Sequence, residues 1–515
     1  MIIRRRNAMK HHDKYFTREE IIRRFQVFDG EKTLGEVDVR DVFHTQVPAK
    51  GVAGCVIEQS VLSMKQNSTQ EADLSILQAD GSYKDTELKV TGVEPSNKQG
   101  EKYAAKEPMS LTAVSIGVIE HEKFLESHFY NKIAHMLFVF YVYDRKSGQK
   151  VVPYAEYDRF PVLGYKFLDI ADDKDELAKF ENDWTQVHDY LVSIENREDR
   201  YDLYPLLHQK IKKDLFYIDI APRFKLQPRQ TPRFRLKKSY VNTLFQNFYN
   251  HKLEKLSEEF NSYSELDRRL HALTEQYRGR TVEELIHIFG IEVKDIHKLC
   301  KHITETIVVH MLGGKSKKIS NIELFEKIGL IAKTITVTRK GMETEQMKLF
   351  TMDLDEITDA SLDYEDTSYY EYFSNHQMLC ILFEEPCTAA PLNDNVFQGF
   401  KRLVFEDEMI NGPIRNVYNE ITDKINNNGV VERYVYRKDG TQRINDTGVP
   451  MTALNFPKQA QSSVFVRGTG TDSNSKPWVF KGRAADGTDT IHAYSQQIWI
   501  KGRYITDMLR KIDFI

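Results

Sequence analysis

The heptapeptide Asp85-Thr-Glu-Leu-Lys-Val-Thr91 alternates polar and apolar side chains. A period of two is typical of a strand, and it places Glu87 and Lys89 on the same face. Upstream, Asp73 begins a second short apolar run, and Gly81 lies in the turn between the two runs. The pattern therefore predicts a hairpin that brings Asp73 beside Glu87.

Two neighbouring carboxylates cannot both stay ionised cheaply unless a cation joins them. Oxygen ligands with open positions suit Mg²⁺, which polarises a phosphoryl oxygen and lowers the pKa of a bound water. An ammonium two residues further on, at Lys89, can orient that water or offset developing negative charge. Asp73 and Glu87 are thus the predicted metal ligands. The alternative is an exposed polar strand face, because acid-x-Lys occurs by chance in most proteins of this size.

A second acid precedes this hairpin, in Lys50-Gly-Val-Ala-Gly-Cys-Val-Ile-Glu58. The segment predicts a helix that opens after Gly51. Glu58 ends an apolar run, where a carboxylate needs a partner, and Lys89 or the metal would supply one. The alternative is a glutamate at a helix edge that reaches solvent.

Composition excludes several classes of protein. Of 515 residues, 41% are hydrophobic and 29% charged, so a disordered or fibrous chain is excluded. The longest apolar run, about ten residues over 134–143, suits a buried strand and is too short for a membrane span. No secretory signal follows the basic start, and four cysteines without a CxxC spacing indicate a reducing compartment, so we expect a cytoplasmic protein without a membrane partner.

Positive charge is concentrated in two places. Residues 210–238 hold ten Lys or Arg against two Asp, a net charge of +8, and three prolines make this stretch mostly loop. Basic residues with interleaved Phe suit contact with a phosphate backbone, and a solvated surface loop is the alternative. A weaker basic stretch near the end of the chain includes Arg467 and Lys501.

The chain also repeats itself. The segment 233–244 is echoed by 497–508, and His135-Met-Leu-Phe-Val-Phe140 by Gln377-Met-Leu-Cys-Ile-Leu382. Similar elements recur in the same order at offsets of about 242 to 264 residues, which chance similarity of amphipathic segments does not explain.

These repeats predict an α/β protein with two tandem related domains, each a mixed sheet flanked by helices. The first covers 1–250 and the second 286–515. Residues 251–285 are rich in Glu, Lys, Leu and Arg with few breakers, which predicts a helical, solvated linker.

Several further motifs accompany these residues. The motifs of the first copy are Lys50-Gly-x-x-Gly-x-x-x-Glu58, Asp73, Glu87-Leu-Lys89, Glu126-Ser-His-Phe-Tyr-Asn-Lys132, Pro161-Val-Leu-Gly, Asn182-Asp-Trp184 and Arg235-Leu-Lys-Lys-Ser-Tyr240. Together they resemble the MutH family of DNA endonucleases. The second copy, with Ile410-Asn-Gly-Pro413 and Val464-Phe-Val-Arg467, resembles the C-terminal half of the two-domain restriction enzymes of that family that cut at GATC.

The resemblance implies a restriction-endonuclease-like fold and Mg²⁺-dependent hydrolysis of double-stranded DNA at 5′-GATC-3′. Two departures stand out: thirteen residues separate Asp73 from Glu87, more than in the single-domain pattern, and the base-reading loop is altered at Ala221-Pro-Arg223-Phe. The implied catalytic residues are Glu58, Asp73, Glu87, Lys89 and Lys132, and the implied DNA contacts are Lys50, Gly51, Arg223, Lys237, Arg467 and Lys501.

The second copy lacks the acids. Aligning the strands places Ile331 where Glu87 stands, and Val308 takes the place of Glu58, while Lys333 matches Lys89. We therefore expect a pseudodimer in which the first domain cuts and the second only binds DNA or regulates.

The predicted function is a type II restriction endonuclease of a restriction-modification system. One active site cuts one strand at a time, so cutting a palindrome needs transient self-association on DNA or sequential nicking. A mismatch-repair nicking enzyme of the same family and a non-catalytic GATC-binding protein are the alternatives.

Overall fold

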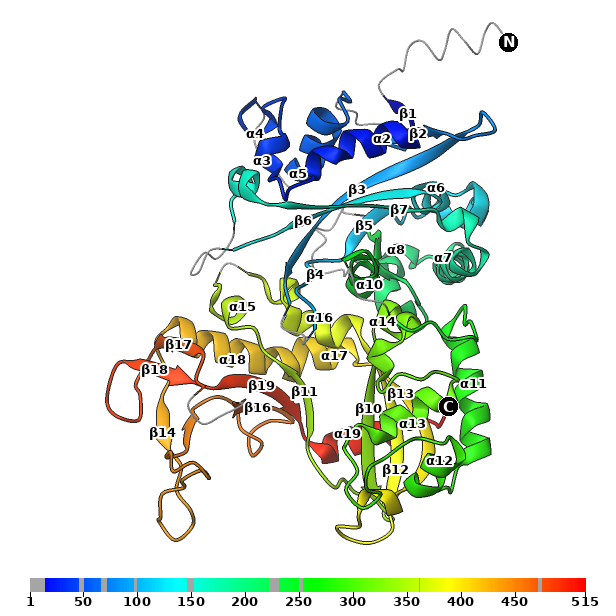
Figure 1. Ribbon diagram of the computed structural model, residues 1–515. Helices are drawn as coiled ribbons and strands as arrows, with labels where there is room; N and C mark the ends of the chain where they lie inside the picture. Colours follow the sequence, from blue (N-terminus) through cyan, green and yellow to red (C-terminus); the bar gives the residue numbers. More distant parts are fainter. Residues whose placement is uncertain are drawn as a thin grey trace, which may run out of the picture. The chain divides into compact units, whose positions relative to one another are not determined.

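The computed structural model divides into two compact units (Figure 1). The first holds residues 1–266 and 321–329, and the second holds 267–320 and 330–515. The units therefore change at Leu266, inside the segment predicted as a linker, and the predicted domain boundaries stay a proposal. The structure describes residues 14–45, 51–65, 72–96, 100–145, 152–221, 231–249, 253–360, 362–470 and 475–515.

The main sheet of the first unit has the strand order β1-β2-β3-β6-β7, and β4 pairs with β3. β2 and β3 run antiparallel, with Gly81 at φ 83° in the turn, so the predicted hairpin is confirmed. β3 pairs in parallel with the wholly buried β6, which is the apolar strand predicted over 134–143. The strands are β1 (Tyr15–Thr17), β2 (Leu74–Leu77), β3 (Tyr83–Pro95), β4 (Tyr103–Ala105), β6 (Met136–Val142) and β7 (Val162–Leu168).

Helices and a smaller sheet, ordered β5-β9-β8, complete the first unit. The long helix α7 begins after the N-cap Asp173, whose side chain accepts two backbone N–H groups, and its buried face carries Phe180, Trp184 and Leu191. The bounds are α2 (Arg18–Phe25), α3 (Leu34–Val37), α4 (Val42–Thr45), α5 (Val52–Val56), α6 (His128–Ile133), α7 (Lys174–Ile194), α8 (Arg200–Leu203), α9 (Leu207–Ile211), α10 (Lys238–Tyr249), α14 (Glu323–Ile328), β5 (Met109–Ala113), β8 (Ile218–Ile220) and β9 (Arg233–Leu236).

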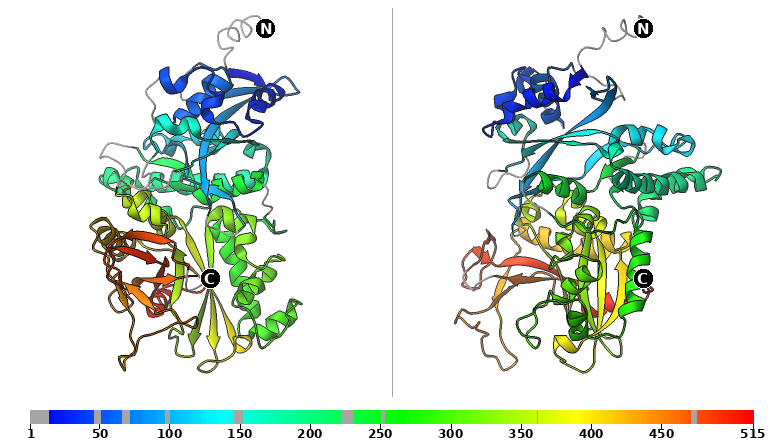
Figure 2. Two further views of the ribbon diagram at one scale, coloured as in Figure 1. Left: turned by 60° about the vertical axis from the view of Figure 1, so that its left-hand side comes forward. Right: turned by 45° about the vertical axis from the view of Figure 1, so that its right-hand side comes forward.

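The second unit is built on a three-stranded sheet, β10-β12-β13, whose strands lie side by side in the views of Figure 2. A second sheet has the order β11-β19-β16, and two hairpins pair β14 with β15 and β17 with β18. The strands are β10 (Leu330–Thr338), β11 (Met347–Thr351), β12 (Gln377–Glu385), β13 (Val396–Leu403), β14 (Glu432–Tyr434), β15 (Thr452–Leu454), β16 (Val464–Thr469), β17 (Trp478–Lys481), β18 (Thr490–Ala493) and β19 (Ser495–Ile500).

Green helices lie along one side of the β10-β12-β13 sheet in Figure 2. α11 crosses the change of unit at Leu266, and its Asp267 pairs with Arg402 of β13 at 2.7 Å. The helices are α11 (Tyr263–Tyr277), α12 (Val282–Ile288), α13 (Ile303–Met311), α15 (Leu354–Thr358), α16 (Ser368–Asn375), α17 (Asp407–Met409), α18 (Arg415–Asn426) and α19 (Gly502–Leu509).

The strand registers of the two units match. In the first, Glu87 lies opposite Met136 on parallel strands β3 and β6. In the second, Ile331 lies opposite Met378 on parallel strands β10 and β12. Since Met136 and Met378 hold the same place in the repeated segments, the backbone pairing supports the alignment of Ile331 with Glu87.

Smaller details recur as well. Ser127 caps α6 by accepting from Tyr130 N, and Thr367 caps α16 by accepting from Tyr370 N. Each antiparallel partner strand, β7 and β13, carries one glycine with positive φ next to a register shift. The predicted mixed α/β fold with helices flanking mixed sheets is confirmed. Within the described part of the chain, none of the helices has the length and apolar character needed to span a bilayer.

Candidate active site

Glu87 lies on the central strand β3 with only 7% of its side chain exposed. Lys89 Nζ donates to Glu87 Oε1 at 2.9 Å, and Lys132 Nζ donates to Glu87 Oε2 at 2.8 Å. The period-two pattern of β3 places Lys89 on the same face of the sheet as Glu87. Lys132 lies on α6, the helix that precedes β6 in the chain. Two ammonium groups thus pair with one buried carboxylate and compensate its charge.

Asp73 reaches the same place from the residue before β2. Its Oδ2 accepts the backbone N–H of Leu88 at 2.9 Å, between Glu87 and Lys89. Burial raises the pKa of Asp73, and the charge of Glu87 raises it further, whereas the Leu88 N–H and the two lysines lower it. The predicted juxtaposition of Asp73 and Glu87 is therefore present.

Glu58 approaches from a third element. The predicted helix is α5, and it continues into a π-helical turn, Ile57–Val61, that carries Glu58. Such turns are frequent at functional sites. Burial raises the pKa of Glu58 to about 7, with further contributions from Asp73 and Glu87, while Lys89 opposes the shift. The alternative of a solvent-facing Glu58 does not hold.

This donor set suits a hard divalent cation. The charges of Asp73 and Glu87 raise the pKa of Glu58, and the charge of Glu87 raises the pKa of Asp73. A cation among the three carboxyl groups would offset this repulsion. Glu87 already gives one oxygen to each lysine, so an ion on Glu87 must share these oxygens or displace an ammonium. Asp73 and Glu87 remain the proposed ligands.

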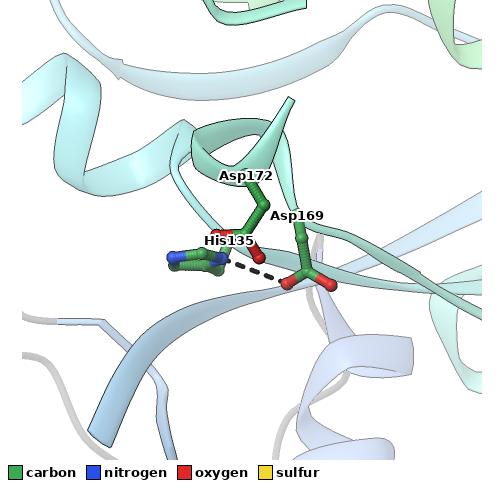
Figure 3. Close-up of side chains that lie close together, drawn as sticks. All are labelled: His135, Asp169 and Asp172. Atoms are coloured by element: carbon green, nitrogen blue, oxygen red, sulfur yellow. Dashed lines mark hydrogen bonds and ion pairs between the residues drawn. The ribbon is translucent and has the colours of Figure 1, made fainter. Parts of the chain in front are cut away.

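A separate group of possible ligands lies on the neighbouring strand ends. His135 Nδ1 lies 3.0 Å from Asp169 Oδ1, with Asp172 beside them (Figure 3), and one ligand atom from each lies within 4.8 Å of the others. Asp169 pairs with Arg18 at 3.3 Å, and Asp172 pairs with Lys84. Because these cations already neutralise both carboxylates, the group is explained as an ion-pair network. The sequence offers no local pattern for this group, because 34 residues separate His135 from Asp169.

Of the predicted DNA contacts of the first unit, one is exposed, one is buried and two lie outside the described residues. Gly51 is exposed at φ 100° as the N-cap of α5. Lys50 and Arg223 lie outside the described residues. The structure differs from the prediction at Lys237, which is 5% exposed and donates its ammonium to the carbonyl oxygens of Leu215 and Ile328. A lysine held in this way serves the fold and does not face DNA.

The predicted DNA contacts of the second unit, Arg467 and Lys501, lie at one cavity and stay a prediction. Both line an open cavity of about 580 Å³ in the second unit. The Arg467 guanidinium lies over the ring of Trp499 at 4.6 Å, which fixes its position while leaving the residue exposed. Lys501 stands at the N-cap of α19.

The second unit keeps the lysine without the acids. Val308 is fully buried in α13, and Lys333 on β10 donates to the carbonyl oxygen of Lys348 at 3.0 Å. Burial lowers the pKa of Lys333 to about 8, with Lys348 contributing. Lys89 of the first unit donates to the carboxylate of Glu87, whereas Lys333 of the second unit donates to backbone carbonyl oxygens.

Comparison with known proteins agrees with this geometry. A central acidic strand with two lysines, in a mixed sheet flanked by helices, defines a restriction-endonuclease-like domain, and residues 62–158 match the MutH family, described as DNA mismatch repair enzyme MutH. The match covers β2, β3, α6 and β6, and with them Asp73, Glu87, Lys89 and Lys132. The chain is also 19% identical over 424 residues to the type II restriction enzyme Sau3AI of Staphylococcus aureus, covering 78% of this chain and 83% of that protein. The resemblance to the MutH family is thereby confirmed.

Proposed function

We propose that this chain is a type II restriction endonuclease that hydrolyses double-stranded DNA at 5′-GATC-3′ with Mg²⁺. The observation that carries the proposal is the pair of hydrogen bonds from Lys89 and Lys132 to the two carboxylate oxygens of Glu87. Asp73 and Glu58 lie beside this carboxylate. The match to MutH over 62–158 and the likeness to Sau3AI support the substrate class.

The residues divide the work of phosphodiester hydrolysis. Mg²⁺ on Asp73 and Glu87 would polarise the phosphoryl oxygens. Lys89 and Lys132 offset the negative charge that develops when a water oxygen attacks the phosphorus and the bond to the leaving oxygen breaks. Glu58, with its pKa near 7, accepts the proton of that water, and the leaving oxygen takes a proton from solvent.

The second unit binds DNA and does not cut. Ile331 and Val308 stand in place of two carboxylates, and neither side chain can ligate a hard cation. Arg467 and Lys501 give this unit a cationic cavity. The asymmetry between the copies favours a cutter and a binder over the alternative of a non-catalytic GATC-binding protein. The two-unit length, shared with Sau3AI, favours a restriction enzyme over a single-domain nicking enzyme.

The test is plasmid cleavage. Wild-type protein with Mg²⁺ should linearise a plasmid at GATC sites, and the mapped ends should fall within that sequence. Glu87→Ala and Lys89→Ala should lower cleavage by more than about a hundredfold while binding of the GATC duplex persists, because the chemistry is lost and the contact surface is not.

A matched control is Glu384→Ala, which removes a partly buried acid on β12 of the second unit and should keep wild-type cutting. Cleavage by Glu87→Ala within tenfold of wild type would refute the site assignment. Ends that map to other sequences would refute the GATC specificity alone.

A further inference from the structure

Residues 432–454 of the second unit, from β14 to β15, form an arm, drawn in orange beside the label β14 in Figure 1. Three extended segments form its frame. Val435 N donates to Met451 O, Met451 N to Arg443 O, and Arg443 N to Val435 O, at 2.8 to 2.9 Å. This ring of hydrogen bonds joins each segment to the other two, so the arm is an ordered three-segment ribbon.

Two tight turns close the ribbon. Asp439 Oδ1 accepts from both the backbone N–H and the hydroxyl of Thr441, and Asn445 Oδ1 accepts from Thr447 Oγ1 and Val449 N. Such side-chain caps hold turns without a hydrophobic core. The arm is therefore preorganised.

The arm exposes large apolar and basic side chains together. Tyr436 is 58% and Ile444 52% exposed. Apolar side chains can contact base edges and basic side chains can contact phosphates, so the combination suits a nucleic acid. Four exposed basic side chains, which form no ion pair among the described residues, accompany them: Arg433, Arg437, Lys438 and Arg443.

The arm forms one wall of a cationic groove. A cavity of about 380 Å³ is lined by Arg443 of the arm and by Arg467 of β16. It shares Lys458 and Arg467 with the 580 Å³ cavity that reaches Lys501. Four cations therefore follow one continuous path.

Among the described residues, four cations and one acid line this groove. Burial lowers the pKa of Lys458, and the neighbouring Lys424 lowers it further. The acid that lines the groove, Glu432, is 8% exposed and pairs with Lys476 at 3.7 Å. A polyanion laid along the groove would relieve this repulsion.

We infer that the arm and this groove together form the DNA-contact surface of the second unit, with the ribbon entering the major groove of a duplex. This rests on the proposed function, and it names the surface through which that unit binds. The major groove of B-DNA admits a two-stranded β-ribbon, and the arm offers two such hairpins, bridged at Tyr436–Gln442 and at Ile444–Pro450. Arg437, Lys438 and Arg443 contact phosphates, and Tyr436 and Ile444 contact sugar and base edges.

The experiment counts bound duplexes. Full-length protein in EDTA is titrated with a GATC duplex of about 14 base pairs, and the stoichiometry is read by native mass spectrometry. Wild type should bind two duplexes per chain, one on each unit, and Arg437→Ala/Lys438→Ala should bind one. The matched control, Lys298→Ala/Lys301→Ala, removes the same charge from exposed positions of the same unit and should bind two.

Salt and apolar variants separate the two kinds of contact. For the site that the arm serves, Arg437→Ala/Lys438→Ala should reduce the slope of log K against log salt by about two units. Tyr436→Ala/Ile444→Ala should weaken binding with the slope unchanged. Both variants should keep the wild-type thermal midpoint, because the arm contributes little to the core.

Each other outcome has a meaning. An arm variant that matches the lysine control in stoichiometry and slope would overturn the inference. Equal losses on single-stranded RNA and on the duplex would overturn the assignment to duplex DNA. Failure of the wild type to cleave with Mg²⁺, while duplex binding in EDTA depends on the arm, would count against the proposed function and leave the arm assignment standing.

Discussion

The carboxyl group of Glu58 meets water in the unfolded chain and two other carboxyl groups in the folded one. Its pKa therefore rises from an ordinary 4.5 to about 7 on folding. Between these values the folded protein keeps a proton that the unfolded chain has released, so stability falls as the pH rises through this window. The cost of ionised Glu58 reaches about 3 kcal/mol above pH 7.

Glu58→Gln removes this cost, because the amide resembles the protonated acid in shape and stays neutral. In EDTA at pH 8 the variant should be more stable than wild type by about 2–3 kcal/mol, and the two should nearly match at pH 5. Urea unfolding at both pH values measures this difference. The variant should also lose cleavage.

Glu19→Gln, on the exposed side of α2, is the control and should show no such pH-dependent gain. A Glu58→Gln protein that is less stable than wild type at pH 8 would mean that the ionised carboxylate is compensated in the fold.

At the scale of single residues, the sequence predicted that Glu87 and Lys89 lie together because a strand of period two fixes which side chains share a face. Resemblance alone supplied Lys132, since a contact with Glu87 across 45 residues leaves no local pattern. Lys237 was wrongly expected on the DNA face. A count of charges along the chain does not report that an ammonium is buried against two carbonyl oxygens.

At the scale of elements, one glycine in each central sheet performs the same task. Gly164 on β7 has φ 140°, and a Cβ there would lie 2.7 Å from the ring of Phe248 in α10. Gly399 on β13 has φ 131°, and a Cβ there would meet Thr274 and Phe514. The glycines allow a helix or the chain end to pack directly on the bulged strand.

Gly164→Ala should therefore destabilise the first unit by about 2–4 kcal/mol, through backbone strain and overpacking against Phe248. Gly81→Ala is the matched control, because Gly81 also has positive φ but faces open space, and it should cost only about 1 kcal/mol. Urea unfolding measures both. Equal losses for the two variants would show that packing against α10 adds nothing.

The sequence did not predict the bulges that need these glycines. Bulges depend on the partner strand and on the helix packed above, neither of which is encoded nearby. The arm at 432–454 was missed for a similar reason, because its three segments have no apolar alternation.

At the scale of the whole molecule, the repeat suggested two halves that separate cleanly, and the chain is more interleaved. α14 lies between segments of the second unit but belongs to the first, where Lys327 pairs with Glu176 at 2.7 Å and with Glu323 at 2.9 Å. Phe325 and Ile328 of the same helix are fully buried. Sequence similarity cannot show which unit such a segment packs with.

A fragment covering 286–515 should consequently fold poorly. It lacks Asp267, which pairs with Arg402, and Thr274, which packs at Gly399. A fragment from Asp267 to Ile515 restores both and should have the higher thermal midpoint. Phe325→Ser/Ile328→Ser should improve the solubility of either fragment, because α14 is then detached from its partners in the first unit. Equal midpoints for the two fragments would contradict the boundary at Asp267.

The proposed function gives each chain one active site, and this predicts the kinetics of double-strand cleavage. A palindrome presents two equivalent phosphodiester bonds, and the second unit has Ile331 in place of the acid, so a single binding event should break one strand. On a plasmid with one GATC site, low protein concentration should accumulate nicked circles, and linear product should form faster than in proportion to concentration as two chains meet. Arg467→Ala should slow cutting most on a plasmid with two GATC sites, because the lost contact is in the binding copy. Gel time courses at several protein concentrations measure the nicked and the linear plasmid. Lys298→Ala/Lys301→Ala, which removes exposed charge from the same unit, is the control for Arg467→Ala. Linear product without nicked intermediate at every concentration, from the chain in monomeric form, would require a second catalytic centre and would contradict the division into a cutter and a binder.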